Sequence, residues 1–313
     1  MLDLECPGDK YFQTTIADEI SFTGIGIHTG QLSKISIKPS SEDSGIIFCR
    51  IDKETGKNLI PALYTNVTST QLCTKLTNSF NVSVRTVEHL MAAFIGFGID
   101  NALVEINSSE VPILDGSSLP FIHAFKKIGV KKLLKKKKVI NILKKLILKD
   151  NDKYISIEPS NELEIEMEIF HNCKAIMKQN YHFILNNNSF LDEIAPARTY
   201  GFKEHASMLR QKGFALGASE NNALVFNNNE VCNTEGLRFD NEPVRHKVLD
   251  CLGDIFMSGF IIKGKIKASK TGHELNNKLM HKIFNNNENW EFIERDLLIN
   301  KELINNELFS AIA

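Results

Sequence analysis

Residues 244–254, Val-Arg-His-Lys-Val-Leu-Asp-Cys-Leu-Gly-Asp, hold the densest group of side chains able to do chemistry. On an α-helix turning by about 100° per residue, His246, Lys247, Asp250 and Asp254 lie within roughly a quarter-turn of one another. The opposite face is apolar and carries Val248, Leu249, Leu252, Ile255 and Phe256. A histidine and a carboxylate four residues apart can bind one metal ion. The pattern fits either a surface helix whose charges face water or part of a metal site, which needs another ligand.

A candidate for that ligand is His89, which follows Glu88 at the start of an otherwise apolar stretch. This pair is either a capping carboxylate beside a half-buried histidine or a metal ligand flanked by a base. With His246 and Asp250, His89 would complete the two-histidine, one-carboxylate set of a catalytic zinc site. Spacing alone cannot bring His89 to His246, because 157 positions (246 − 89) separate them.

Further residues could act on a reaction at such a metal. Glu88 could take a proton from water. His273 follows a glycine between a strand and a helix, and could protonate a leaving group while Asp254 holds it charged. Thr199 offers a hydroxyl to a developing oxyanion. Lys247 suits a contact to a phosphate or a sugar.

Composition limits the class of protein. The chain has 313 residues, 42% of them hydrophobic and 24% charged, which is typical of a soluble globular protein of one large or two ordinary domains. A net charge of −1 gives no case for nucleic-acid binding. No apolar run has the length of a membrane span, and the acidic N-terminus lacks the features of a signal peptide. Six cysteines without Cys-x-x-Cys spacing favour reduced thiols and a cytoplasmic location.

Hydrophobic periodicity predicts alternating strands and helices. A helix over residues 87–94 would be capped by Thr86 and ended by Gly96 and Gly98. The glycine-dense residues 24–30 predict either a plain hairpin or a backbone cradle for a ligand. We expect strands at residues 32–38, 101–106, 154–158, 163–169, 223–226 and 261–267, and helices at 120–127, 203–212, 244–258 and from about 275.

Eleven lysines in residues 126–149 mark the predicted domain boundary. The domains would be residues 1–132 and 133–313. The run fits a solvated linker followed by an edge strand that its lysines protect from aggregation. Attraction to anionic membrane lipid is the alternative.

Ordered blocks over about residues 12–290 resemble the bacterial UDP-3-O-acyl-N-acetylglucosamine deacetylases, the zinc amidases of lipid A synthesis. The blocks are Gly-Ile-Gly-Ile-His-Thr-Gly at 24–30, Gln-Leu-Cys-Thr at 71–74, Ser-Val-Arg-Thr-Val-Glu-His-Leu at 83–90, Gly-Ile-Asp-Asn at 98–101, Pro-Ile-Leu-Asp-Gly-Ser at 112–117, Ala-Arg-Thr-Tyr-Gly-Phe at 197–202, Glu-Gly-Leu-Arg-Phe at 235–239, Val-Arg-His-Lys-Val-Leu-Asp at 244–250 and Gly-His at 272–273.

The resemblance implies zinc-dependent hydrolysis of UDP-3-O-(3-hydroxyacyl)-N-acetylglucosamine to the free amine and acetate, the committed step of lipid A biosynthesis. It implies one zinc ion per chain, with iron(II) as an alternative in the cell. The implied roles are zinc ligands for His89, His246 and Asp250, general base for Glu88, general acid for His273, orientation of that acid for Asp254, oxyanion donor for Thr199 and substrate contact for Lys247.

The implied fold is α+β, with two domains of similar layering and the active site between them. An insert at about residues 202–223 would form a tunnel for the acyl chain, lined by Ala206, Met208, Leu209, Phe214 and Ala215. Leu72 and Cys73 would lie near the head group, and Tyr200 and Phe202 would also contact substrate.

Departures from the family pattern are Tyr200, Ala218 and Thr271, where Phe, Gly and Ser are expected, and residues 169–173, where no aromatic contact to uracil can be assigned. The expected partner is a small UDP-linked substrate, with no nucleic acid, at most peripheral membrane contact, and a monomeric state. The alternative function is a catalytically inactive homologue that binds the nucleotide-sugar lipid.

Overall fold

The computed structural model describes residues 9, 11–186 and 188–294. The first half of the chain contains one sheet in the order β2–β3–β9–β4–β5, a smaller sheet β6–β7–β8 and a ribbon of β1 with β10. Its elements are β1 (Phe12–Ile16), β2 (Ile20–Ile25), β3 (Leu32–Pro39), β4 (Ile46–Arg50), β5 (Leu59–Pro61), η1 (Tyr64–Asn66), β6 (Val67–Ser69), β7 (Lys75–Thr77), β8 (Ser83–Arg85), α1 (Glu88–Phe97), β9 (Ala102–Ile106), α2 (Leu119–Ile128) and β10 (Val130–Lys136).

The second half forms a sheet in the order β12–β13–β18–β11–β19, to which β14 and β15 add beside β18. Its elements are β11 (Lys138–Ile142), β12 (Leu146–Asp150), β13 (Lys153–Glu158), β14 (Leu163–Phe170), β15 (Lys178–Ile184), η2 (Phe190–Ile194), β16 (Tyr200–Phe202), η3 (Lys203–His205), α3 (Ala206–Gln211), β17 (Leu224–Phe226), α4 (Glu242–Phe256), β18 (Ile261–Ser269), α5 (His273–Phe284), η4 (Asn287–Asn289) and β19 (Trp290–Glu294). The mixed architecture confirms the predicted α+β class.

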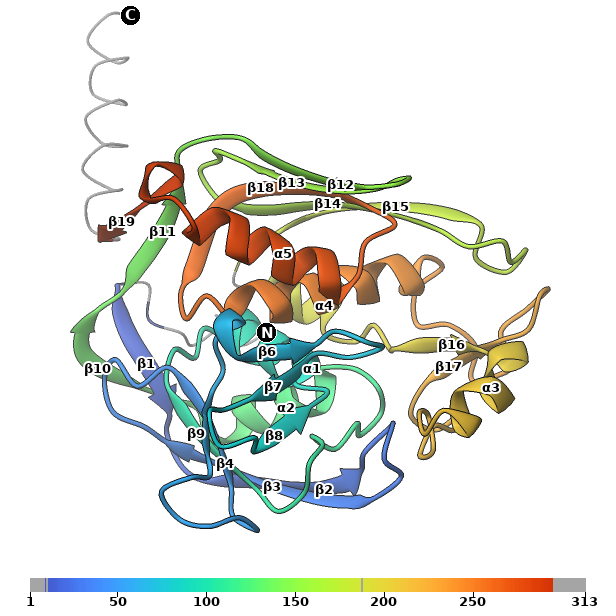
Figure 1. Cartoon of the computed structure of the whole chain (residues 1–313), viewed down its shortest axis with the longest axis horizontal. Coiled ribbons are helices and arrows are strands. Elements are labelled where there is room, and N and C mark those ends of the chain that lie inside the picture. The colour runs from blue at the N-terminus through green and yellow to red at the C-terminus, as the bar shows by residue number, and fades with distance from the viewer. Residues whose placement is uncertain (1–8, 10, 187, 295–313) are drawn as a thin grey trace, which may run out of the picture.

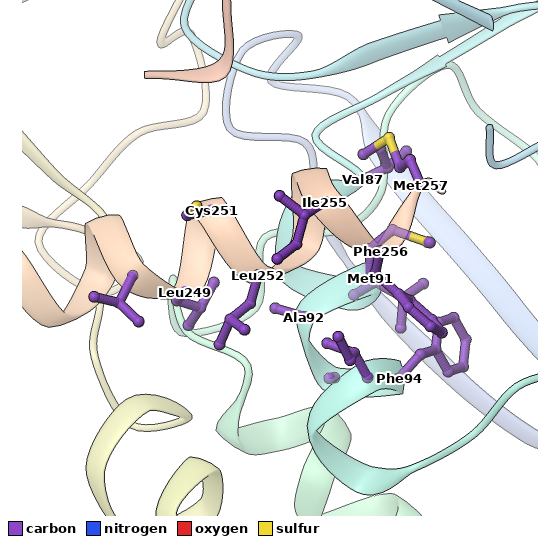
Figure 2. Packing of buried hydrophobic residues seen from close by; sticks show 14 of the residues in the cluster. Val87, Met91, Ala92, Phe94, Leu249, Cys251, Leu252, Ile255, Phe256 and Met257 are labelled. Carbon is purple, nitrogen blue, oxygen red and sulfur yellow. The ribbon is translucent and has the colours of Figure 1, made fainter. Parts of the chain in front are cut away.

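Helices α1 and α4 lie side by side between the two main sheets (Figure 1). Their contact is apolar, and Figure 2 shows α1 residues such as Met91 and Phe94 beside Leu252 and Phe256 of α4. Gly253 makes the close approach possible, because a Cβ there would lie 2.0 Å from the carbonyl oxygen of Glu88. The two helices that carry the candidate ligands are therefore packed backbone against backbone at the start of α1.

Two sequence-based expectations for α1 and α4 need correction. Thr86 does not cap α1, because it has a φ of 57° and its hydroxyl donates to Glu110 over 2.8 Å. The helix instead begins at Glu88 and ends before Gly98, which has a φ of 77°. The interpretation of residues 244–258 as a surface helix is also wrong, since His246, Asp250 and Asp254 are buried.

The lysine run is mostly strand rather than solvated linker. Strand β10 pairs with β1 in the first half. In the second half β11 lies between β18 and β19, whereas β12, with its exposed Lys149, is at the edge of the sheet. The edge-strand expectation therefore applies to β12 and not to β11. Lys137, which joins β10 to β11, is buried, and its Nζ lies 2.9 Å from Asp100 Oδ2. The linker interpretation fails here because this lysine is buried and paired with a carboxylate. The proposed boundary after residue 132 falls within β10 and stays a prediction.

The glycine-dense turn joins β2 and β3, which confirms the hairpin interpretation. The turn also cradles an anion, although that anion belongs to the chain itself. The backbone N–H groups of His28 and Thr29 donate to the carboxylate of Glu110 over 2.9 and 2.8 Å. The segment after α3 packs on the other side of the turn, where Leu216 N donates to His28 O over 3.2 Å.

Candidate active site

Three buried side chains converge between α1 and α4. His89 Nε2 lies 3.6 Å from Asp250 Oδ1, and His246 Nε2 lies 3.3 Å from the same oxygen. The ligand atoms of the three residues all lie within 4.8 Å of one another. The packing of α1 on α4 thus brings together two histidines whose proximity the sequence alone could not establish.

The donor set fits a metal ion. Tetrahedral zinc with bonds of about 2.0–2.1 Å places neighbouring ligand atoms about 3.4 Å apart, close to the two distances around Asp250 Oδ1. That oxygen is buried and accepts no hydrogen bond from any residue in the described part of the chain. A buried carboxylate oxygen without a donor is costly unless a cation takes that place.

The ring of His246 is held in one orientation. Its Nδ1 lies 3.1 Å from the carbonyl oxygen of Ala197. Because a carbonyl only accepts, Nδ1 carries the hydrogen and Nε2 presents a lone pair toward Asp250. Burial lowers the pKa of His246, which further favours the neutral ring that a metal requires.

Asp250 is kept ionised by its surroundings. Burial alone would raise the pKa of Asp250, but its interactions with His246 and Lys247 hold that pKa well below its usual range. Lys247 Nζ donates to Asp250 Oδ2 over 2.6 Å, on the side away from the histidines. Lys247 is thus placed at the rim of the ligand set rather than inside it.

Glu88 is buried beside the ligands. Burial raises its pKa to about 7, an effect that His273 opposes and that Asp250 and Asp254 reinforce. The backbone N–H of Thr74 donates to Glu88 Oε2 over 3.1 Å. A carboxyl group with a pKa near neutrality can accept a proton from water and release it again.

His273, the first residue of α5, forms a second buried pair with Asp254. Its Nδ1 donates to Asp254 Oδ2 over 2.8 Å, and its Nε2 lies 3.8 Å from Glu88 Oε1. Burial alone would lower the pKa of His273, but the carboxylate of Asp254 outweighs it, with help from Glu88 and Asp250, and raises the pKa to about 9. The imidazolium form therefore predominates at neutral pH.

A cavity of about 350 Å³ joins these groups. Its wall includes the predicted residues Leu72, Glu88, His89, Thr199, Tyr200, His246, Lys247, Asp250 and His273. Thr199 is fixed by its backbone, whose N–H donates to Gly116 O over 2.8 Å. Cys73 and Asp254 are buried behind the wall rather than on it.

The remaining predicted substrate contacts lie on the projecting segment of β16, α3 and β17 (Figure 1). Met208 is 46% exposed, and Phe214 makes an edge-to-face contact with His28. None of the residues Phe202, Ala206, Met208, Leu209, Phe214 and Ala215 borders the 350 Å³ cavity, and their part in an acyl tunnel stays a prediction. In the region that gave no aromatic contact, His171 Nε2 lies 2.9 Å from the hydroxyl of Tyr200.

Sequence reasoning missed two residues that hold Asp254. Thr74 Oγ1 donates to Asp254 Oδ1 over 2.7 Å, and Asn276 Nδ2 donates to Asp254 Oδ2 over 2.8 Å. Thr74 belongs to the Gln-Leu-Cys-Thr block at residues 71–74, in which the sequence alone gives this threonine no role. Asn276 has no signal in the sequence other than its position three residues after His273. Asp150 and Lys153, from the β12–β13 hairpin, also border the cavity and had not been singled out.

Comparisons with known proteins agree on one family. The family model described as UDP-3-O-acyl N-acetylglycosamine deacetylase (LpxC) matches residues 13–285. Proteins named UDP-3-O-acyl-N-acetylglucosamine deacetylase are 41% identical over 283 residues in Mannheimia succiniciproducens, 42% over 283 in Wigglesworthia glossinidia brevipalpis and 40% over 286 in Pasteurella multocida. These alignments cover 90–91% of this chain and 92–95% of each relative. Within the described residues, no helix has the length and apolar character needed to cross a membrane.

Proposed function

The chain belongs to the UDP-3-O-acyl-N-acetylglucosamine deacetylase family, and we propose that it catalyses this deacetylation with the groups around the cavity of His89, His246 and Asp250. The protein is a hydrolase of an amide bond in lipid A biosynthesis. Its substrate is UDP-3-O-(3-hydroxyacyl)-N-acetylglucosamine, and its products are acetate and the 2-amino sugar. The observation that carries the residue assignment is the meeting of the ligand set with Glu88 and His273 in one cavity.

His89, His246 and Asp250 would hold the metal ion, for which zinc is our proposal and iron(II) the alternative in the cell. When bound, the metal would activate a water molecule and polarise the acetamide carbonyl. The support is chemical: two neutral imidazoles and one carboxylate form a common ligand set for catalytic zinc. The Asp250 oxygen without a hydrogen bond lies where such an ion would bind.

Glu88 would be the general base. With a pKa of about 7, its carboxylate can accept the proton of the attacking water as the new C–O bond forms. It borders the same cavity as the ligand residues, adjacent in sequence to His89. The hydrogen bond from Thr74 N to Oε2 leaves Oε1 to receive that proton.

His273 would be the general acid. Its Nε2–H faces the cavity while Nδ1–H is bonded to Asp254, so the Nε2 proton is the one available for the departing amine. Thr199 would donate its hydroxyl to the tetrahedral oxyanion. Lys247, with its Nζ on Asp250 Oδ2, would contact the hexose or the diphosphate.

The rest of the substrate would extend from this cavity. Leu72 and Tyr200 would contact the substrate near its sugar, with Cys73 buried next to Leu72. The segment of about residues 202–223 would receive the acyl chain along the apolar side chains named above. We further propose domains of residues 1–132 and 133–313, a monomeric state and a cytoplasmic location. These proposals rest on the family resemblance and on sequence composition.

The test is acetate release from UDP-3-O-(3-hydroxyacyl)-N-acetylglucosamine by the purified full chain. We expect a chelator to abolish turnover and added zinc to restore it. Iron(II) added to the same stripped protein under anaerobic conditions would compare the two metals. A folded chain that retains full turnover after complete removal of metal would contradict the proposed mechanism.

A further inference from the structure

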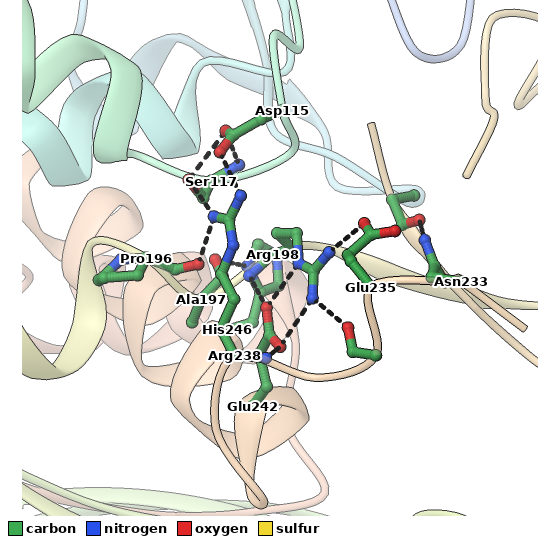
Figure 3. A network of polar contacts seen from close by, with 12 residues as sticks. Asp115, Ser117, Pro196, Ala197, Arg198, Asn233, Glu235, Arg238, Glu242 and His246 are labelled. Atoms are coloured by element: carbon green, nitrogen blue, oxygen red, sulfur yellow. Dashed lines mark hydrogen bonds and ion pairs between the residues drawn. The ribbon is translucent and has the colours of Figure 1, made fainter. Parts of the chain in front are cut away.

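A buried ion pair lies directly behind the ligand His246 (Figure 3). The Arg198 side chain is 4% exposed and that of Glu242, the first residue of α4, is fully buried. Arg198 Nε donates to Glu242 Oε1 over 2.9 Å, and Nη2 donates to Oε2 over 3.2 Å. Such forked pairing fixes both position and direction, which a lysine could not do.

The peptide group between Ala197 and Arg198 connects this pair to His246. Its N–H, which belongs to Arg198, donates to Glu242 Oε1 over 2.9 Å. Its C=O, which belongs to Ala197, accepts from His246 Nδ1 over 3.1 Å. Glu242 and His246 are one helical turn apart on α4, so a single peptide plane is held at both ends by one face of that helix.

A second arginine, Arg238, connects the same segment to the first half of the chain. Arg238 N donates to Glu242 Oε2 over 2.6 Å, and Arg238 Nη1 donates to Pro196 O over 2.9 Å. Its Nη2 also donates to Asp115 Oδ2 over 2.9 Å. The segment that supplies the Ala197 carbonyl is thus fixed to α4 and to the loop around Asp115.

His89 has no such support. Its Nδ1 is buried and has no hydrogen-bond partner among the residues that the structure describes. Of the two ligand histidines, only His246 has its tautomer and ring direction set by a hydrogen bond within the described residues, namely the bond to the Ala197 carbonyl.

We propose that Arg198 and Glu242 are positioning residues for metal binding, which act by fixing the Ala197–Arg198 peptide that orients His246. The inference rests on the proposed metal site. Partners behind a metal-binding histidine typically change metal affinity by about 10- to 100-fold when they are altered. Arg198 and Glu242 touch neither the metal-facing atoms nor the cavity, so the effect passes through the peptide.

The test uses the full chain and zinc alone. Zinc affinity of the stripped protein is measured by competition with a chromophoric chelator, for the wild type, Arg198→Lys, Glu242→Gln and His246→Gln. A control of the same type is Arg50→Lys on β4, because the buried Arg50 side chain forms the same fork, 2.8 and 2.7 Å to Asp52. Asp52 itself is 32% exposed, and the pair is far from α4 in sequence. Melting curves of the metal-free proteins report the fold.

We expect Arg198→Lys and Glu242→Gln each to weaken zinc binding about 10- to 100-fold. Arg50→Lys should lower the melting temperature and leave zinc affinity within about twofold of wild type. Wild-type zinc affinity in both Arg198→Lys and Glu242→Gln, with a loss in His246→Gln, would overturn the positioning role alone. Wild-type affinity in His246→Gln would overturn the metal assignment beneath it.

A spectroscopic readout guards against variants that fold poorly. Nitrogen-15 shifts of the His246 ring in the metal-free chain distinguish the Nδ1–H from the Nε2–H tautomer. We expect the Nδ1–H tautomer in the wild type and in Arg50→Lys, and a mixture in Arg198→Lys. An unchanged tautomer in Arg198→Lys, together with unchanged zinc affinity, would contradict the proposal.

Discussion

Helix α4 carries the aspartates of two histidine–aspartate pairs that have the same residue types and opposite chemistry. Asp250 faces His246 and His89, while Asp254, one turn later, faces His273. Burial lowers the pKa of His246, whereas the pKa of His273 is raised to about 9. All four side chains are buried, so burial alone does not separate the pairs.

The hydrogen-bond partners of each aspartate account for the difference. Asp254 accepts from Thr74, Asn276 and His273, so both of its oxygens are satisfied by protons. Asp250 has Lys247 on one oxygen and no donor from the described chain on the other. A carboxylate whose two oxygens both accept hydrogen bonds, such as Asp254, stabilises the protonated form of its histidine. A carboxylate with one oxygen that accepts no hydrogen bond, such as Asp250, is suited to binding a metal ion.

The strongest test of this difference between the two pairs is to remove the carboxylate of Asp250, which belongs to the proposed metal ligands. Asp250→Ala should lose bound metal and lower turnover by about 10³-fold or more, because activation of water by a metal supplies several kcal/mol of transition-state stabilisation. His89→Ala should behave alike. Metal analysis of the dialysed proteins and acetate release are the measurements, and wild-type metal content in His89→Ala would remove that residue from the ligand set.

Glu88 separates loss of metal from loss of chemistry. Glu88→Ala should retain metal and lower kcat by about 10²- to 10⁴-fold, the usual contribution of a general base. Its neighbour His89 should lose both when replaced, so the two adjacent residues serve as controls for each other. Loss of metal in Glu88→Ala would assign the carboxylate to the ligand set instead.

Periodicity was enough to predict α4 and its two faces, because the apolar positions follow the helical repeat and the polar ones cluster opposite. Periodicity did not predict that the polar face is buried. A helix face with His246, Asp250 and Asp254 has the composition of a solvent-exposed face, and only the packing of other elements on it shows that it is buried. The contact of His89 with Asp250 arises from tertiary packing of α1 on α4, and in the sequence only the family resemblance indicated it.

Predictions from local sequence were also wrong where a side chain binds a residue distant in the sequence. Thr86 has the side chain of an N-cap, but the buried Glu110 takes its hydroxyl. Lys137 sits within a run that suggests solvent, but Asp100 and the carbonyl of Gly98 bind it. In both cases a carboxylate more than twenty residues away in the sequence outweighed the local preference, and no single-sequence pattern encodes such a partner.

Thr199 offers a smaller test on the metal side of the comparison. Thr199→Val removes a hydroxyl at nearly constant volume and should lower kcat about 10²-fold, the typical effect of deleting one oxyanion donor. Metal content and the pH dependence of kcat should not change, because no hydrogen bond links Thr199 to either histidine–aspartate pair in the described residues. Wild-type kcat in Thr199→Val would exclude this hydroxyl from the oxyanion site.

The smallest expected effect concerns the proton side and depends on pH. Asp254→Asn removes the main charge that raises the pKa of His273 from 6.5 to about 9. If that pKa returns to about 6.5, only about a tenth of His273 is protonated at pH 7.5, and turnover should fall about tenfold there. The basic limb of the kcat profile should move from near pH 9 to near pH 6.5, with metal content unchanged.

The same substitution has a consequence for stability, with a defined sign. Because folding raises the pKa of His273, the wild-type pair stabilises the fold fully below pH 6.5, and this contribution is lost as the pH rises through about 9. Asp254→Asn should therefore lower the melting temperature of the metal-free chain at pH 6 more than at pH 9.5. An equal loss at both pH values would mean that Asp254 stabilises the fold through its hydrogen bonds with Thr74 and Asn276 rather than through a charged His273. The two histidine–aspartate pairs would then differ less than their hydrogen bonds indicate.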